Sequence, residues 1–173
     1  MSSDMSNVAD DNDASTDTVL AAAMVIDSVG STSRRAAIGE SAANRIDRAE
    51  RAQMTSAVRD QGGTILEFTG DGAIALLPSA SAAVSAAFAL CAPHYRIGIA
   101  VGEVRRDGSA WTGAPLVAAT QLERRCPPGA VACSALAVRT ASSAPAATSE
   151  PLRADGDHDG DDQSGAMVLR PSA

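Results

Sequence analysis

One stretch decides the fold that this sequence predicts, and over residues 24–32 it reads Met-Val-Ile-Asp-Ser-Val-Gly-Ser-Thr. Its first three residues complete an apolar run at 19–26, which is too short to span a bilayer and has the length of a buried strand. Asp27 follows that strand directly, and a turn then begins a helix. Backbone N–H groups at the start of a helix bind anions. The predicted phosphate-binding residues are therefore Ser28, Val29, Gly30, Ser31 and Thr32.

A second acidic turn, Thr-Gly-Asp-Gly, occupies residues 69–72 between short apolar strands at 64–68 and 73–77. An Asp-Gly pair in so short a connection predicts a β-hairpin. If the first strand lies beside this hairpin, Asp27 and Asp71 project from the same end of the sheet and can share a hard divalent cation. The alternative for each residue alone is a local role, Asp71 in turn chemistry and Asp27 as a cap.

The rest of the chain alternates between helical and extended patterns. Three helices are predicted: from the turn at 28–32 to Gln61-Gly62-Gly63 with Ile38, Ala42, Ile46 and Ala49 on one face; from an N-cap at Ser79 to Cys91 with Ala83, Ala87 and Leu90 on one face; and over 116–126 with Ala119, Leu122 and Cys126 aligned. Further strands are predicted at 95–101, 130–134 and 166–169, with an irregular segment at 102–113. This order predicts an α+β fold with a ferredoxin-like βαββαβ core and extra strands and helices.

The 173 residues suffice for one domain with a full core. Hydrophobic residues make up 45% of the chain but aromatic residues only 2%, so we expect a core of small, closely packed side chains. The predicted organisation is a disordered acidic leader at 1–17, a folded domain at 18–139, a flexible Ala/Pro/Asp-rich loop at 140–165 and a terminal strand at 166–173. Residues 155–160 match the start of an EF-hand loop, but Ala166 stands where the twelfth-position Glu belongs, so an acidic solvated loop is predicted.

Charge and composition argue against several classes of protein. The net charge of −7 argues against a nucleic-acid partner, and the absence of Lys excludes a Walker-type phosphate loop. Cys91, Cys126 and Cys133 are odd in number and form no CxxC pair, so we predict buried free thiols in a reducing compartment. With no basic n-region and no membrane-spanning apolar run, we expect a cytoplasmic protein without membrane contact.

Taken together and in order, these motifs resemble the catalytic domain of the bacterial class III adenylyl/guanylyl cyclases over residues 19–139. That family has a strand ending in Asp before a Gly-Ser-type turn, as at 24–32, and a Thr-x-Gly-Asp-type hairpin, as at 68–72. A later family strand is similar to RIGIAVGEV at 96–104. The family helix that carries an Asn and an Arg aligns with GAPLVAATQLE at 113–123, and the strand after it matches PGAVACS at 128–134.

The resemblance implies that Asp27 and Asp71 hold two metal ions, Mg²⁺ or Mn²⁺, which activate the ribose 3′-hydroxyl and hold the triphosphate. The family selects its base at the position four residues before the second Asp, with Lys in adenylyl cyclases and Glu in guanylyl cyclases. Glu67 occupies that position here. A carboxylate accepts from the N1–H and N2–H₂ groups of guanine, so Glu67 implies GTP ahead of ATP. The alternative is an ordinary strand Glu that faces solvent.

Two positions depart from the family. Its transition-state Asn aligns with Val117, which has no polar side-chain atom, and its transition-state Arg aligns with Gln121, which is uncharged. Loss of one preorganised donor typically lowers the rate by roughly 10²–10³. We therefore expect a degenerate cyclase domain in which neither residue is catalytic.

In the family the active site lies between two chains: one supplies the metal carboxylates, and the other supplies the base-selecting residue, the Asn and the Arg. The resemblance thus implies a homodimer, or a heterodimer with another cyclase-type chain. Three functions stay open. The chain is a weak or inactive domain that binds a metal–nucleoside triphosphate and regulates signal transduction, or a divergent guanylyl-type cyclase making cGMP and pyrophosphate, or the metal-binding half of a heterodimer.

Overall fold

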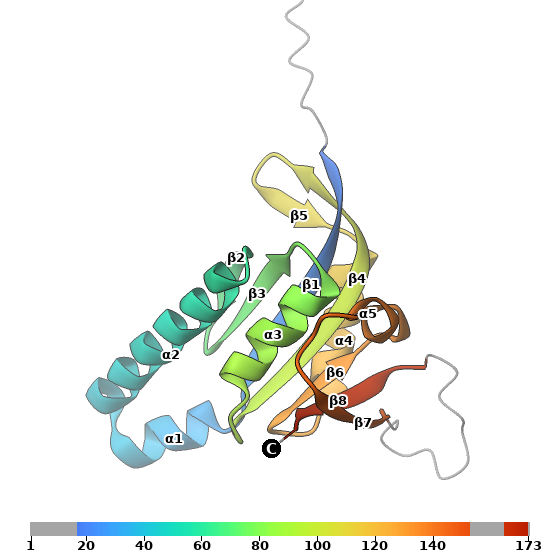
Figure 1. Cartoon of the computed structure of the whole chain (residues 1–173). Helices are drawn as coiled ribbons and strands as arrows, with labels where there is room; N and C mark the ends of the chain where they lie inside the picture. Colours follow the sequence, from blue (N-terminus) through green and yellow to red (C-terminus); the bar gives the residue numbers. More distant parts are fainter. Residues whose placement is uncertain (1–16, 153–164, 173) are drawn as a thin grey trace, which may run out of the picture.

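The computed structural model describes residues 17–152 and 165–172, which fold into one eight-stranded sheet with helices on both faces (Figure 1). In chain order the elements are β1 (Thr18–Ser28), α1 (Ser31–Ile38), α2 (Glu40–Asp60), β2 (Thr64–Thr69), β3 (Gly72–Leu77), α3 (Ala80–Leu90), β4 (Tyr95–Asp107), β5 (Ala110–Thr112), α4 (Ala114–Arg125), β6 (Ala130–Cys133), α5 (Ala135–Thr140), β7 (Ala147–Pro151) and β8 (Met167–Pro171). The strand order is β2-β3-β1-β4-β6-β8-β7, and β5 pairs with β4 outside this path. The predicted α+β fold is confirmed.

Strand β1 lies at the centre of the sheet and pairs antiparallel with β3 on one side and β4 on the other. Ala22, Ala23 and Met24 have no exposed surface, because the strand is covered on both faces. That double burial explains why its sequence is a continuous apolar run rather than an alternating one.

Two hydrophobic cores form, one on each face of the sheet. Helices α2, α3 and α5 cover the first face and α4 covers the second (Figure 1). The expected core of small side chains is clearest under α4, where β4 and the helix approach each other backbone to backbone. A Cβ atom added to Gly98 of β4 would lie 2.1 Å from the carbonyl oxygen of Ala119. Glycine at this position therefore sets how closely α4 can pack.

Several local predictions are confirmed. The Ser79 side chain accepts a hydrogen bond from the Ala82 N–H at 3.1 Å and caps α3, as its sequence position indicated. Strands β2 and β3 form the predicted hairpin, and Thr69 pairs with Gly72 across a two-residue turn. Gly70 takes a φ of 69° in that turn, a conformation that glycine adopts at little cost.

The prediction of one continuous helix from the turn at 28–32 to residue 60 is wrong. Gly39 adopts a φ of 80° and separates α1 from α2, and it is the N-cap residue of the longer helix. The predicted inward face is also wrong, because Ile38 is 43% exposed. The residues of α2 that are buried are Ala43, Glu50, Met54 and Val58. Because the helix axis changes direction at Gly39, Ile38 of α1 does not lie on the same face as the predicted apolar residues of α2.

Three other segments also differ from their predictions. The stretch expected to be irregular at 102–113 is mostly regular, since β4 continues to Asp107 and turns back at Gly108 into β5. Helix α5 was not predicted. Strand β7 lies within the expected loop at 140–165, where its exposed residues carry no alternating apolar pattern. Pairing with β8, the predicted terminal strand, organises it.

Two predictions fall outside the described residues: the disordered leader, apart from its last residue, and the EF-hand-like segment at 155–160. All three cysteines are described, and all are free thiols. Burial raises the pKa of Cys133 to about 12. Among the described residues, no helix is both long enough and apolar enough to cross a membrane.

Candidate metal and nucleotide site

The two predicted metal carboxylates lie at the same end of neighbouring strands. Ile26 of β1 pairs with Ala73 of β3, so Asp27 at the end of β1 lies next to the turn that carries Asp71. The backbones approach closely there, because a Cβ atom added to Gly72 would lie 2.1 Å from the carbonyl oxygen of Ile26. The fold therefore brings together two acidic residues that are far apart in the sequence.

Helix α2 supports the turn that carries Asp71. Arg51 donates a hydrogen bond through Nη2 to the carbonyl oxygen of Gly70 at 2.7 Å. Its guanidinium also lies over the Phe68 ring, 4.9 Å from the ring centroid. These two contacts fix the hairpin tip relative to the helix and so fix the position of Asp71.

Asp27 is paired with an arginine. Nη2 of Arg96, its register partner on β4, lies 2.5 Å from Oδ2 of Asp27. Nε of the same arginine lies 3.2 Å from Oε1 of Glu123 on α4, and the Glu123 side chain is only 8% exposed. Burial raises the pKa of Glu123; the positive charge of Arg96 opposes this shift, and the negative charges of Asp27 and Asp71 add to it. Glu123 therefore lies within electrostatic range of both Asp27 and Asp71.

The predicted phosphate-binding turn is only partly available. Ser28 is buried and pairs with Tyr95 in the sheet, and the Val29 N–H donates to the carbonyl oxygen of His94 at 2.7 Å. Gly30 follows with a φ of 78° and begins α1, where no side chain caps the helix. The first N–H groups of α1 remain at the exposed start of the helix. Phosphate binding by the five residues stays a prediction, and within them the N–H of Val29 is already donated to His94.

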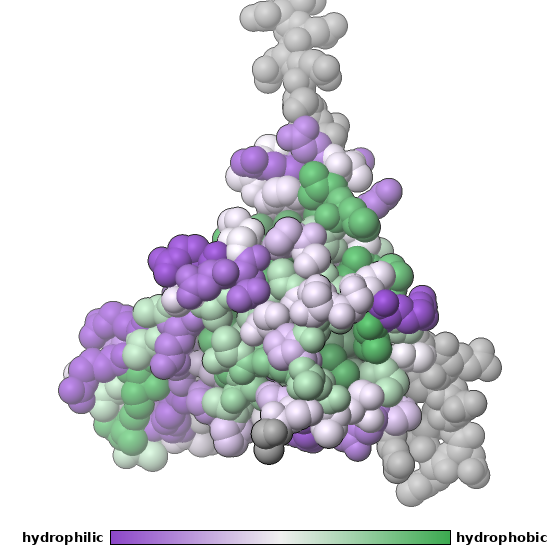
Figure 2. Space-filling model, in the orientation of Figure 1, coloured by the Kyte–Doolittle hydropathy of each residue, from purple (hydrophilic) through white to green (hydrophobic). Residues whose placement is uncertain are grey.

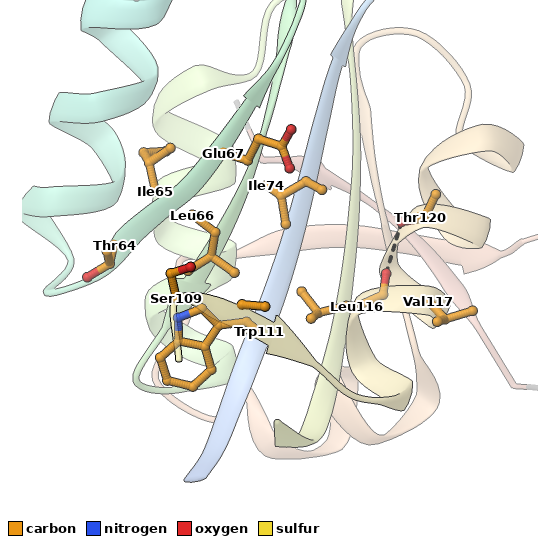
Figure 3. A pocket seen from close by; sticks show the side chains of 11 residues that line it. Thr64, Ile65, Leu66, Glu67, Ile74, Ser109, Trp111, Leu116, Val117 and Thr120 are labelled. Carbon is orange, nitrogen blue, oxygen red and sulfur yellow. Dashed lines mark hydrogen bonds between the residues drawn. The ribbon is translucent and has the colours of Figure 1, made fainter. Parts of the chain in front are cut away.

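Glu67 lies in the wall of a separate cavity of about 530 Å³ on the α4 face of the sheet (Figure 3). One wall comes from β2 and β3, the other from α4, and the β4–β5 hairpin closes one end. The lining residues are Thr64, Ile65, Leu66, Glu67, Ile74, Ser109, Ala110, Trp111, Leu116, Val117 and Thr120. Figure 3 shows the Glu67 carboxylate at the opposite end from the Trp111 indole, with Leu116 and Val117 across from both. Of the described residues that line this cavity, Glu67 alone carries a charge.

Solved structures share this fold. The chain superimposes on an adenylate/guanylate cyclase/hydrolase from Silicibacter pomeroyi with a TM-score of 0.73 and 23% identity, covering 91% of this chain and 99% of that one. For the adenylyl cyclase CyaB from P. aeruginosa the TM-score is 0.72, with 16% identity and coverage of 91% and 97%. For the guanylyl cyclase Cya2 it is 0.67, with 18% identity and coverage of 89% and 91%. The sequence matches no protein-family model and no curated protein.

The chain has the fold of the class III nucleotide cyclase domains. On this cyclase fold, Val117 and Gln121 lie one turn apart on α4, and both are exposed, Val117 by 59%. Val117 contributes to the cavity wall next to Leu116, whereas Gln121 is not among the lining residues. The position aligned with the family Asn therefore presents an apolar surface to the cavity that contains Glu67.

Asp27 and Asp71 are the candidate metal ligands at the acidic end of this cyclase fold. Within residues 17–152 and 165–172, no three His, Cys, Asp or Glu side chains are arranged to hold a metal ion together. Asp27 and Asp71 offer hard oxygen ligands, and Mg²⁺ in phosphoryl-transfer sites is commonly held by one or two carboxylates plus substrate phosphates. The donor set therefore suits Mg²⁺ or Mn²⁺ bound together with a triphosphate.

Sequence reasoning missed several residues of both regions. Trp111 is the single tryptophan of the chain and lies in the cavity wall, although its segment was expected to be irregular. Arg96 and Glu123 were read only as parts of aligned motifs. One signal was available for Glu123, since it stands next to Leu122 in the apolar stripe of its helix, and a charge at such a position needs a partner. Arg96 carried no comparable signal.

Proposed function

We propose that this chain is a class III nucleotide cyclase homology domain that binds a metal–nucleoside triphosphate, is catalytically weak or inactive alone, and acts as a regulatory module in signal transduction. One contrast carries the proposal. The acidic pair at the ends of β1 and β3 is intact, whereas α4 presents Val117 and Gln121 where the resembling family has an Asn and an Arg. Ligand binding depends on the first group, and stabilisation of the transition state depends on the second.

The residues of the chain divide the work of binding. Asp27 and Asp71 would hold Mg²⁺ or Mn²⁺, which supplies charge neutralisation for the triphosphate and lowers the pKa of a hydroxyl that it binds. The N–H groups at the start of α1 would bind the phosphates of a nucleotide placed beside this pair. Glu67 of the second chain of a dimer would orient the base in the cavity, as in the resembling family, with Trp111 and the aliphatic wall of that chain excluding water.

A nucleotide titration tests this proposal. We expect a fluorescent GTP analogue to bind in the presence of Mn²⁺, and the Asp71→Asn substitution to weaken that binding by at least about tenfold because a direct cation ligand is lost. The Asp60→Asn variant is the matched control, since it removes one negative charge from an exposed position on α2. Equal affinities for all three proteins would show that Asp71 is not a metal ligand, and no binding with Mn²⁺ would leave only a structural or interaction role.

The Glu67→Lys variant tests the choice of base. GTP is expected to bind ahead of ATP in the unmodified chain, and the substitution should reduce the ratio of the two affinities by roughly tenfold or more, because an ammonium cannot accept from guanine. Competition between unlabelled GTP and ATP measures the ratio. The control is Thr64→Val, which changes a polar residue of the same cavity but leaves the carboxylate in place. An unchanged ratio in Glu67→Lys would mean that Glu67 simply faces solvent.

The second candidate function is a guanylyl-type cyclase, either as a divergent homodimer or as the metal-binding half of a heterodimer. The intact acidic pair favours it, because a partner that carries the Asn and Arg would complete the site. The exposed apolar surface also favours assembly: Val19 is 41% and Leu20 is 70% exposed, and hydrophobic side chains reach the surface around the start of β1 (Figure 2). Product formation only after mixing with such a partner would favour the heterodimer over the regulatory module.

A further inference from the structure

Arg96 contacts two carboxylates that have different surroundings. Its Nη2 lies 2.5 Å from Oδ2 of Asp27, and its Nε lies 3.2 Å from Oε1 of Glu123. The Asp27 side chain is 32% exposed and can face solvent, whereas the Glu123 side chain is 8% exposed and faces the sheet under α4. One guanidinium therefore joins an accessible carboxylate to a buried one.

The pairing with Asp27 opposes the binding of a cation there. A guanidinium in contact with Oδ2 occupies one of the oxygens that a metal would use, and its charge repels a second cation at short range. Asp27 can become a metal ligand only if Arg96 withdraws from it. Glu123 gives Arg96 a place to remain, since a buried carboxylate keeps its need for a positive partner.

We infer that Arg96 is a positioning residue for metal binding. In the metal-free chain Arg96 neutralises Asp27, and when Asp27 binds a divalent cation Arg96 stays paired with Glu123. This inference rests on the proposed function, because it concerns the same metal site. In this inference the role of Glu123 is to hold Arg96 when Asp27 binds metal. The affinity of the site for metal is then set by a competition between the cation and the chain's own arginine.

A double-mutant cycle on Mn²⁺ affinity tests the inference in the full chain without nucleotide, by titration calorimetry or by the electron paramagnetic resonance signal of free Mn²⁺. Arg96→Gln is expected to bind Mn²⁺ about tenfold more tightly, because the competing cation is gone, and Glu123→Gln several-fold more weakly, because Arg96 then has only Asp27. In the Arg96→Gln background, Glu123→Gln should have little further effect. If Arg96 and Glu123 acted on the metal site only through their separate charges, their effects on Mn²⁺ affinity would instead be additive.

Arg124→Gln is the matched control, because Arg124 is exposed and adjacent to Glu123 in the sequence but lies on the solvent side of α4. It should change Mn²⁺ affinity by less than about twofold. Additive effects in the cycle, or an Arg124→Gln effect as large as that of Arg96→Gln, would overturn the role of Arg96 while leaving the metal site in place. Absence of Mn²⁺ binding in every variant would overturn the metal site itself.

Thermal unfolding without metal gives an independent readout. Asp27→Asn and Arg96→Gln should each lower Tm, and the double variant should lower it no further than Arg96→Gln alone, because both changes break one ion pair. If Arg96→Gln fails to fold, Arg96→Lys replaces it: a Lys ammonium is a point charge and cannot contact both carboxylates as the planar guanidinium does. Coupling between Arg96 and Asp27 supports the inference, and independent effects on Tm contradict it.

Discussion

The unmodified chain is expected to form little cyclic nucleotide from GTP with Mn²⁺, and the pair Val117→Asn with Gln121→Arg is expected to raise the rate by roughly 10²–10³. The reason is that the two groups of residues act at different stages of the reaction. The acidic pair and the start of α1 contact the nucleotide in the ground state as well as the transition state, whereas the amide and guanidinium act mainly where charge develops. Both positions are exposed on α4, so the substitutions should cost little stability.

Quantification of cyclic nucleotide by mass spectrometry measures this gain. The matched control is Val117→Leu with Gln121→Met, which changes the same two exposed positions without adding a donor or a charge and should restore nothing. Adding Asp71→Asn to the restored variant should abolish the product, because the metal carboxylate is then missing. Rapid turnover by the unmodified chain would show that the alignment of α4 with the family helix is wrong.

The sequence predicted those parts of the fold that depend on local chemistry. The apolar run before Asp27, the short hairpin turn and the Ser79 cap each have a signal within a few residues, and the structure confirms all three. The placement of Asp27 beside Asp71 could also be predicted, because residues at the same end of neighbouring strands in one sheet lie close together. Whether the pair binds metal stays a prediction.

What the sequence did not show depends on contacts between distant segments. The cavity with Glu67 forms only when the β4–β5 hairpin closes one end of the space between β2 and α4, and no local pattern encodes that. The pairing of Arg96 with Glu123 likewise depends on the height at which α4 packs on β4. The break at Gly39 was missed because a glycine inside a helical pattern is often tolerated, and only its positive φ shows that the helix ends.

The packing of α4 on β4 gives the largest stability effect that we expect. An added methyl group at Gly98 would lie 2.1 Å from the carbonyl oxygen of Ala119 and 2.5 Å from the backbone nitrogen of Glu123. Both atoms belong to the backbone of α4, so no side-chain rotation can relieve the clash and the helix must move away from the sheet. Gly98→Ala should therefore lower the free energy of unfolding by about 3 kcal/mol or more, the upper end for overpacking a core.

Thermal unfolding measures this effect as a decrease in Tm of roughly 6–12 °C for a domain of this size. Gly108→Ala is the matched control, because Gly108 has a φ of 60° and open space around it. That variant should lower the free energy of unfolding by only about 1 kcal/mol, the cost of placing alanine at a positive φ. Because the clash involves the Ala119 backbone, adding Ala119→Gly should not rescue Gly98→Ala. Rescue by that change, or equal Tm values for the two glycine variants, would contradict the backbone-to-backbone packing that positions Val117 and Glu123 over the sheet.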